Sequence, residues 1–379
     1  MKKKQPEYYS LDKILELGAN INMIVGERSN GKSYAALKRA LERFWNYGFE
    51  FAYIRRYHKN INENVGVEIF NNLINNGEIA KITKGEYNSI YYRAGQFRLS
   101  RINDETGKRE TSETICGYGM ALEDCEEYKS RSFPLVGTII FDEFATKKRY
   151  IYKEQEDWES ILSTIMRKKD KDHLPEIFML ANTVNIYCPY YEFYGLKNAK
   201  NSKPGTIELY QYKSGLTIAY EHTPHSIEAD SDKYFNHNEN SRSMIIYGDY
   251  EMETYPKLPT TYTQKQVLYT FYVSFDNECL ICDIVMVGNG ESFIYIRKSK
   301  HNIIVEGFAV YQFRKENEII FVDKTSPNKF IRRNFLKPYD KISQKILRYY
   351  QTDNIYYEDD LCGEIMRNYI NICKDMGKD

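Results

Sequence analysis

The sequence lacks long apolar runs and has no even set of cysteines. No apolar segment approaches the roughly 20 residues that cross a membrane, and the start Met1-Lys-Lys-Lys leads into polar sequence instead of an apolar secretion signal. Seven cysteines, an odd number spread over the chain, favour free thiols in a reducing compartment over a disulfide framework. We therefore expect a protein without a membrane span, located in the cytoplasm.

Three further absences narrow the function classes. Lys plus Arg (53) balances Asp plus Glu (53), so a polyanion must be held by local patches, not by an overall basic field. The single C-x-x-C, Cys279 and Cys282, has no second pair or histidine cluster near it in sequence to complete a zinc site. The guanine signature N-K-x-D is also missing. These observations disfavour zinc and GTPase assignments and leave nucleic acid open as a partner.

The order of the predicted elements indicates two folded regions joined by a connector. Strands alternate with helices over residues 1–197, which predicts an α/β fold with a doubly wound, mostly parallel sheet. Residues 198–255 are polar and irregular and read as a linker region. Residues 256–379 show strands first and helices last, which predicts a separate, smaller α+β domain.

Apolar runs and turn signals place the individual elements. In the first region we expect strands at 21–25, 49–57, 134–144 and 176–183, helices at 32–48, 61–77 and 155–169, and a hairpin inserted at 86–118 around the polar turn 103–108. In the second region we expect strands at 267–275, 279–287, 292–298, 302–313 and 318–323, and helices at 339–350 and 358–376.

The segment INMIVGERSNGKS (21–33) carries the pattern G-x-x-x-x-G-K-S between a strand and a helix. This context is typical of a phosphate-binding loop, because glycines let backbone N–H groups turn toward a phosphate while the helix directs its positive end at it. Lys32 is expected to bridge the β and γ phosphates and Ser33 to bind Mg²⁺. The residues expected to contact the nucleotide are Gly26, Glu27, Arg28, Ser29, Asn30, Gly31, Lys32, Ser33 and Tyr34. For Arg28, contact with a phosphate, contact with a carboxylate and simple solvation stay open.

Two acidic residues close the buried-type strand PLVGTIIFDEF. Asp142 is expected to hold Mg²⁺, and Glu143 to polarise the water that attacks the γ-phosphate. This second carboxylate favours hydrolysis over a small-molecule kinase reaction. Asn182, at the end of the next strand, can touch the γ-phosphate or serve only as a strand-end turn residue.

Basic and aromatic residues suggest further contacts. Arg55, Arg56 and Lys59 follow the second strand with tyrosines between them, a pattern that could grip a phosphodiester backbone. The cluster RKKDK at 167–171 offers either an arginine finger or a solvated helix end. Tyr8 and Tyr9 could stack on adenine or pack in the core.

The motifs GERSNGKS, FAYIRRY, TIIFDEF and MLANT, in that order, resemble those of the DNA-packaging ATPases of phi-29-like podophages, relatives of large terminases in the ASCE class of P-loop ATPases. The resemblance implies ATP and Mg²⁺ as cofactors and Lys32, Ser33, Asp142 and Glu143 as the Walker A and B residues. It implies Asn182 as a sensor-like residue and Arg167 or Lys169 as the arginine finger that acts on a neighbouring subunit.

The resemblance also implies an assembly. In this family a homopentameric ring sits on the portal of an empty capsid, in the host cytoplasm, and drives double-stranded DNA inward; one branch uses a structural packaging RNA. Its C-terminal domain resembles an RNase H-like nuclease that has lost its acidic centre. Here Asp276, Asp283 and Asp323 are scattered, which favours a vestigial nuclease. A helicase-type or AAA-like ATPase on another polymer and a nucleotide-switched scaffold remain as rivals.

Overall fold

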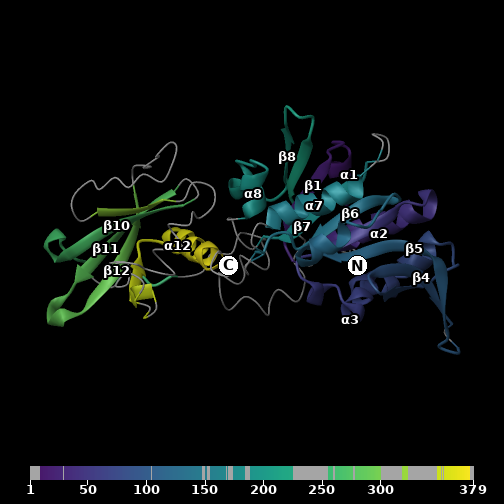
Figure 1. The fold of residues 1–379 in the computed structure, drawn as a ribbon, viewed down its shortest axis with the longest axis horizontal. Coiled ribbons are helices and arrows are strands. Elements are labelled where there is room, and N and C mark those ends of the chain that lie inside the picture. The colour runs from purple at the N-terminus through teal and green to yellow at the C-terminus, as the bar shows by residue number, and fades with distance from the viewer. Residues whose placement is uncertain are drawn as a thin grey trace, which may run out of the picture. The chain divides into compact units, whose positions relative to one another are not determined.

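The computed structural model divides the chain into two compact units, Met1–Glu251 and Met252–Asp379, whose elements are shown in Figure 1. The residues that the structure describes are 9–28, 30–103, 105–146, 150–151, 154–167, 169, 174–183, 188–224, 255–258, 261–275, 278–299, 318–322, 348–350, 352 and 354–375. No helix among these residues is long and apolar enough to cross a membrane.

A nine-stranded sheet forms the first unit. In spatial order its strands are β3 (Ser89–Arg93), β4 (Gln96–Ile102), β5 (Arg109–Ala121), β2 (Glu50–Arg55), β6 (Val136–Asp142), β7 (Glu176–Asn182), β1 (Ile21–Gly26), β9 (Thr217–His222) and β8 (Thr206–Gln211). The six strands from β5 to β9 in this order pair in parallel, and antiparallel hairpins supply the strands at both edges. The predicted doubly wound, mostly parallel α/β fold is confirmed.

Helices cover both faces of this sheet because its central strands are apolar on both sides. Along β1, Ile24 packs with the residues of α2 on one face, and Met23 and Val25 pack with those of α7 on the other. The helices are α1 (Asp12–Leu15), α2 (Lys32–Tyr47), α3 (Glu63–Gly66), α4 (Asn71–Asn75), α5 (Glu78–Ile82), α6 (Cys125–Tyr128), α7 (Glu154–Met166) and α8 (Pro189–Phe193). The helix predicted over 61–77 is therefore broken into short pieces, with Asn62 capping α3 through its side chain.

Two predictions about the first unit are wrong. The hairpin of β4 and β5 is not an insertion, because β5 pairs in parallel with β2 and so extends the sheet. The linker predicted from residue 198 contains β8 and β9, and β9 lies beside β1 with Ile218 and Tyr220 fully buried. Their polar, tyrosine-rich sequence hides this pairing. Of the predicted linker, residues 225–254 lie outside the described residues.

A five-stranded sheet forms the second unit, in the order β13 (Glu318–Val322), β10 (Val267–Phe275), β11 (Glu278–Met286), β12 (Ser292–Lys298) and β14 (Ile355–Tyr357). The helix α12 (Asp360–Asp375) packs on it through Cys362, Ile365, Met366 and Tyr369, all fully buried. The predicted smaller sheet domain is confirmed, and its likeness to RNase H stays a prediction. The strand predicted at 302–313 and most of the helix predicted at 339–350 lie outside the described residues.

Six cysteine side chains are described, and all are buried free thiols: Cys116, Cys125, Cys188, Cys279, Cys282 and Cys362. Burial raises the pKa of Cys125 and of Cys188 to about 11. The expectation of free thiols is confirmed for these six.

Candidate functional site

The loop between β1 and α2 has the form expected of a phosphate cradle. Gly31 is the N-cap of α2 and has φ +99°, a left-handed conformation that glycine adopts without steric cost. Lys32 and Ser33 therefore lie in the first turn of a 16-residue helix, where unpaired N–H groups and the helix dipole favour an anion. Arg28 is exposed, and Ser29 lies outside the described residues.

The Lys32 ammonium is buried at the centre of this loop, with the residue only 5% exposed. Its Nζ donates to the Glu27 carbonyl oxygen at 2.6 Å and to Asn30 Oδ1 at 3.0 Å. Burial lowers the pKa of Lys32 to about 8, while the charges of Asp142 and Glu27 act to raise it. Phosphate oxygens can replace these two oxygen acceptors.

The predicted magnesium ligands lie together at the carboxyl edge of the sheet. Ser33 Oγ donates to Asp142 Oδ1 at 3.2 Å, and Asp142 is the last residue of β6. Hydroxyl and carboxylate oxygens are the donors that Mg²⁺ prefers, so this pair fits the ion.

Tyr53 is a member of this site that sequence reasoning missed. Its hydroxyl donates to Asp142 Oδ2 at 2.7 Å, and the side chain is buried on β2. Burial, and then the charge of Asp142, raise the pKa of Tyr53, so the hydroxyl stays a donor. Tyr53 reaches Asp142 because β2 lies beside β6, with Tyr53 paired to Ile140. The sequence does not show this strand order.

Glu143 follows Asp142 in a left-handed conformation, with φ +62°. This conformation is uncommon for a residue with a side chain. Its carboxylate is 55% exposed and lies 2.6 Å from the Arg55 guanidinium. Arg55 is the last residue of β2, next to β6, and only 14% of its side chain is exposed. Arg55 therefore lies at the candidate catalytic site, and its contact with DNA stays a prediction.

Arg56 is only 6% exposed, so the prediction that its side chain contacts DNA is wrong in this structure. Its Nε donates to Glu154 Oε2 at 2.6 Å, and Glu154 is fully buried. The same guanidinium donates to the backbone carbonyls of Glu143 at 2.9 Å and Phe144 at 2.7 Å. Of the predicted DNA-binding residues, Lys59 keeps an exposed side chain, and its Nζ lies 5.4 Å from the centre of the Tyr57 ring.

Asn182 lies at the same edge of the sheet as the loop. It ends β7 and pairs in register with Gly26, and β7 runs between β1 and β6. The half-buried Asn182 is therefore close to the phosphate loop in the backbone framework, and its sensor role stays a prediction.

The two arginine-finger candidates differ in exposure. Arg167 is exposed and donates to the Lys129 carbonyl at 3.2 Å. Lys169 donates to the Pro134 carbonyl at 2.7 Å, and burial lowers its pKa. Arg167 is the more exposed of the two side chains, and the identity of the finger stays a prediction.

A cavity of about 720 Å³ lies beside the phosphate loop. It is lined by Tyr9, Ser10, Leu11, Asp12, Leu15, Tyr34, Ala35, Lys38, Arg39, Glu42, Asn76, Glu78 and Lys81. Tyr9 both lines this cavity and packs against the core on the α2 face, so the two roles left open for it are compatible. Tyr8 lies outside the described residues.

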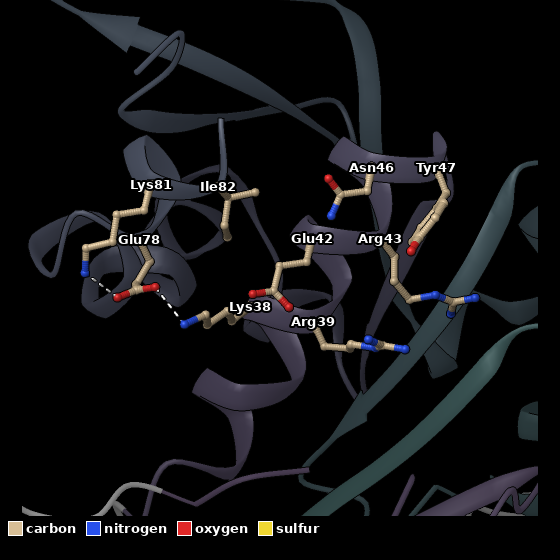
Figure 2. A pocket seen from close by; sticks show the side chains of 9 residues that line it. All are labelled: Lys38, Arg39, Glu42, Arg43, Asn46, Tyr47, Glu78, Lys81 and Ile82. Atoms are coloured by element: carbon tan, nitrogen blue, oxygen red, sulfur yellow. Dashed lines mark hydrogen bonds and ion pairs between the residues drawn. The ribbon is translucent and has the colours of Figure 1, made fainter. Parts of the chain in front are cut away.

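A neighbouring cavity of about 380 Å³, whose lining side chains are drawn in Figure 2, shares five residues with the first: Lys38, Arg39, Glu42, Glu78 and Lys81. Glu78 accepts from both lysines, at 2.8 Å from Lys38 and 2.7 Å from Lys81. Burial acts to raise the pKa of Glu78, but the hydrogen bonds from these lysines lower it overall. The Lys38–Glu78 ion pair joins α2 to α5, whereas the Lys81–Glu78 pair lies within α5. All three side chains line the larger cavity.

The structure describes one of the three predicted nuclease candidates, all of which belong to the second unit. Asp283, on β11, is 3% exposed and accepts from Tyr262 at 2.8 Å and Thr270 at 2.7 Å. Arg297 lies 3.3 Å from the same carboxylate. Asp276 and Asp323 lie outside the described residues. Among the described residues, no group of three or more acidic, histidine or cysteine side chains could hold a metal ion.

Three comparisons place this chain among known proteins. It is 27% identical over 192 residues to the DNA packaging protein of Bacillus phage phi29, and 29% identical over 180 residues to that of Bacillus phage B103. The alignments cover 50% and 46% of this chain, and the chain spans about half the length of these relatives, 50% and 48%.

A solved structure of the bacteriophage phi-29 viral genome packaging motor assembly has a similar fold, with a TM-score of 0.51 and 17% identity over 97% of this chain and 99% of the other. The model of the podovirus DNA encapsidation protein family (Gp16) matches residues 2–211, more than half of the sequence. This chain therefore belongs to the podovirus DNA encapsidation protein (Gp16) family.

Proposed function

We propose that this chain is an ATP-driven motor that moves double-stranded DNA through the portal into a preformed capsid. The observation that carries the proposal is the meeting of Lys32, Ser33, Asp142 and Glu143 at one edge of the parallel sheet. Membership of the encapsidation family and relatives named as DNA packaging proteins support the cargo.

Each residue has a distinct task in hydrolysis. Lys32 exchanges its two oxygen acceptors for β- and γ-phosphate oxygens, and the first turn of α2 supplies N–H donors to the phosphates. Ser33 and Asp142 would hold Mg²⁺, which when bound neutralises phosphate charge. Glu143 orients and deprotonates the attacking water, and to do so its carboxylate must leave Arg55.

The 720 Å³ cavity is the proposed site of the adenine base. It begins at Tyr9, whose backbone N–H donates to the phosphate-loop carbonyl of Asn30 at 3.2 Å, and it continues past Tyr34. Tyrosine rings offer a base flat apolar surfaces for stacking.

The remaining roles concern the assembly. We place Arg167 as the finger that stabilises charge at the neighbouring active site in a homopentameric ring, and Lys59 as a DNA phosphate contact. The portal is the docking partner, a structural packaging RNA is a further candidate partner, and the second unit is a vestigial nuclease. The motor acts in the host cytoplasm, transiently on the procapsid.

The variant Glu143→Gln tests the proposed hydrolysis. It keeps the shape of the side chain and removes its basicity, so MgATP binding is retained while turnover falls by about 10²-fold or more. Binding is measured by calorimetry and turnover by phosphate release, with Glu126→Gln, an exposed carboxylate paired with Lys129, as control. Hydrolysis by Glu143→Gln at the parent rate would show that Glu143 is not the base. Packaging of DNA into purified empty capsids tests the cargo.

A further inference from the structure

The carboxyl end of β9 reaches the phosphate loop. β9 pairs in parallel with β1 and ends at His222. The N–H of Thr223, the residue after the strand, donates to the Val25 carbonyl at 2.8 Å. A Cβ added to Gly26 would lie 1.8 Å from Thr223 Oγ1. The first glycine of the loop is therefore required by the close approach of Thr223.

Thr223 also holds the loop through Asn30. The Asn30 amide Nδ2 donates to Thr223 Oγ1 at 2.8 Å, and Thr223 is 2% exposed. The Asn30 carbonyl oxygen Oδ1 accepts from Lys32 Nζ at 3.0 Å and from its N–H at 3.3 Å. The amide of one side chain thus joins the end of β9 to the phosphate-binding lysine.

A second connection from β9 fixes the backbone of the same residue. The Tyr9 N–H donates to the Asn30 carbonyl at 3.2 Å, and the Tyr9 hydroxyl donates to Glu221 Oε2 at 2.5 Å. Glu221 belongs to β9 and precedes Thr223, the residue that follows the strand, by two positions. Asn30 is therefore anchored to the end of β9 through both its side chain and its backbone.

We infer that Thr223 is a positioning residue for the nucleotide, holding Asn30 so that the loop and Lys32 are ordered before the phosphates arrive. This inference rests on the proposed nucleotide site. Without the Thr223 hydroxyl, nucleotide binding must also order Asn30, which weakens the affinity. The loss of one neutral hydrogen bond corresponds to about a 3- to 10-fold rise in the dissociation constant.

The test compares three variants of the full chain. Thr223→Val removes the hydroxyl and keeps the shape, and Thr223→Ser restores a hydroxyl. Thr217→Val is a matched control at the other end of β9, where the hydroxyl bonds to Asn20. Calorimetry with MgADP gives the dissociation constants, ATP turnover separates KM from kcat, and thermal unfolding reports stability.

The inference predicts that Thr223→Val raises the MgADP dissociation constant about 3- to 10-fold and raises KM by more than it lowers kcat. Thr223→Ser recovers affinity, and Thr217→Val binds like the parent. Equal affinity of Thr223→Val and the parent would overturn the inference, as would equal weakening by both valine variants. If Thr223→Val does not fold, Thr223→Ala takes its place with the same expectations. Absence of binding by the parent would instead refute the proposed nucleotide site.

Discussion

At the residue scale, the two adjacent arginines at the end of β2 have different energetic roles. Arg56 forms a buried ion pair with Glu154, which also accepts from the Tyr190 hydroxyl at 2.8 Å and the Ile151 N–H at 3.0 Å. Arg55 pairs with a Glu143 side chain that is 55% exposed. Removing one member of a buried pair leaves the other charge desolvated and unpaired, whereas an exposed partner is rehydrated.

We therefore expect Arg56→Ala to lower the free energy of unfolding of the first unit by about 3–5 kcal/mol. Arg55→Ala is the matched control and should cost about 1 kcal/mol or less. Both tryptophans of the chain, Trp45 and Trp158, lie in the first unit, so their fluorescence in a denaturant titration reports this unit alone. Equal costs for the two substitutions would contradict the assignment of Arg56 as a structural residue.

The site could be predicted from sequence only where a motif carries it. Lys32, Ser33 and Asp142 were expected to meet because the carboxyl ends of parallel strands share one edge of a sheet. Thr223 and Tyr53 were missed because their roles depend on strand neighbours far away in sequence. Sequence alone does not separate a buried, paired arginine such as Arg56 from one exposed to DNA.

At the element scale, the apolar strands were predictable and the polar edge was not. β1, β6 and β7 are buried on both faces and read as apolar runs. β8 lies at the edge of the sheet with mostly half-exposed or exposed residues, so its sequence resembles a connector. The pairing of β9 with β1 makes residues beyond 197 part of the first folded unit.

A truncation series tests this boundary. The fragment 1–251 should unfold in one cooperative transition and bind MgADP, because it retains β9 beside β1. The fragment 1–197 leaves the edge of β1 and its apolar neighbours uncovered, so it should be aggregated or lack a cooperative transition. Tryptophan fluorescence in denaturant measures both. A fragment 1–197 with the same midpoint as 1–251 would show that β8 and β9 are dispensable for folding.

At the scale of the whole molecule, the proposed ring requires that subunits complete each other's active sites. Arg167 is exposed, and its guanidinium donates to the backbone carbonyl of Lys129, the C-cap residue of α6. In the proposed ring, Arg167 exchanges this hydrogen bond for a contact with a neighbouring copy. An arginine finger contributes about 10³ to 10⁵ in rate, so its loss should nearly abolish turnover.

Mixing two inactive variants tests action between subunits. In mixed rings of Arg167→Ala and Lys32→Ala, an Arg167→Ala subunit keeps its own phosphate loop and receives Arg167 from a Lys32→Ala neighbour. ATP turnover by the mixture should therefore exceed the sum of the two variants measured separately. A second mixture, in which Lys169→Ala replaces Arg167→Ala, separates the two finger candidates. If Arg167 is the finger, Lys169→Ala alone keeps its turnover. Activity no greater than that sum would place the finger within its own subunit or elsewhere.

The six buried thiols are divided between the units, three in Met1–Glu251 and three in Met252–Asp379. Alkylating reagents attack thiolates, and burial both shields these sulfurs and disfavours their ionisation. Each thiol reacts only when the structure around it opens. Peptide mass spectrometry after brief labelling therefore measures the opening rate around each cysteine, separately for the two units. The native cysteines thus report local opening of the structure without engineered cysteines or dyes.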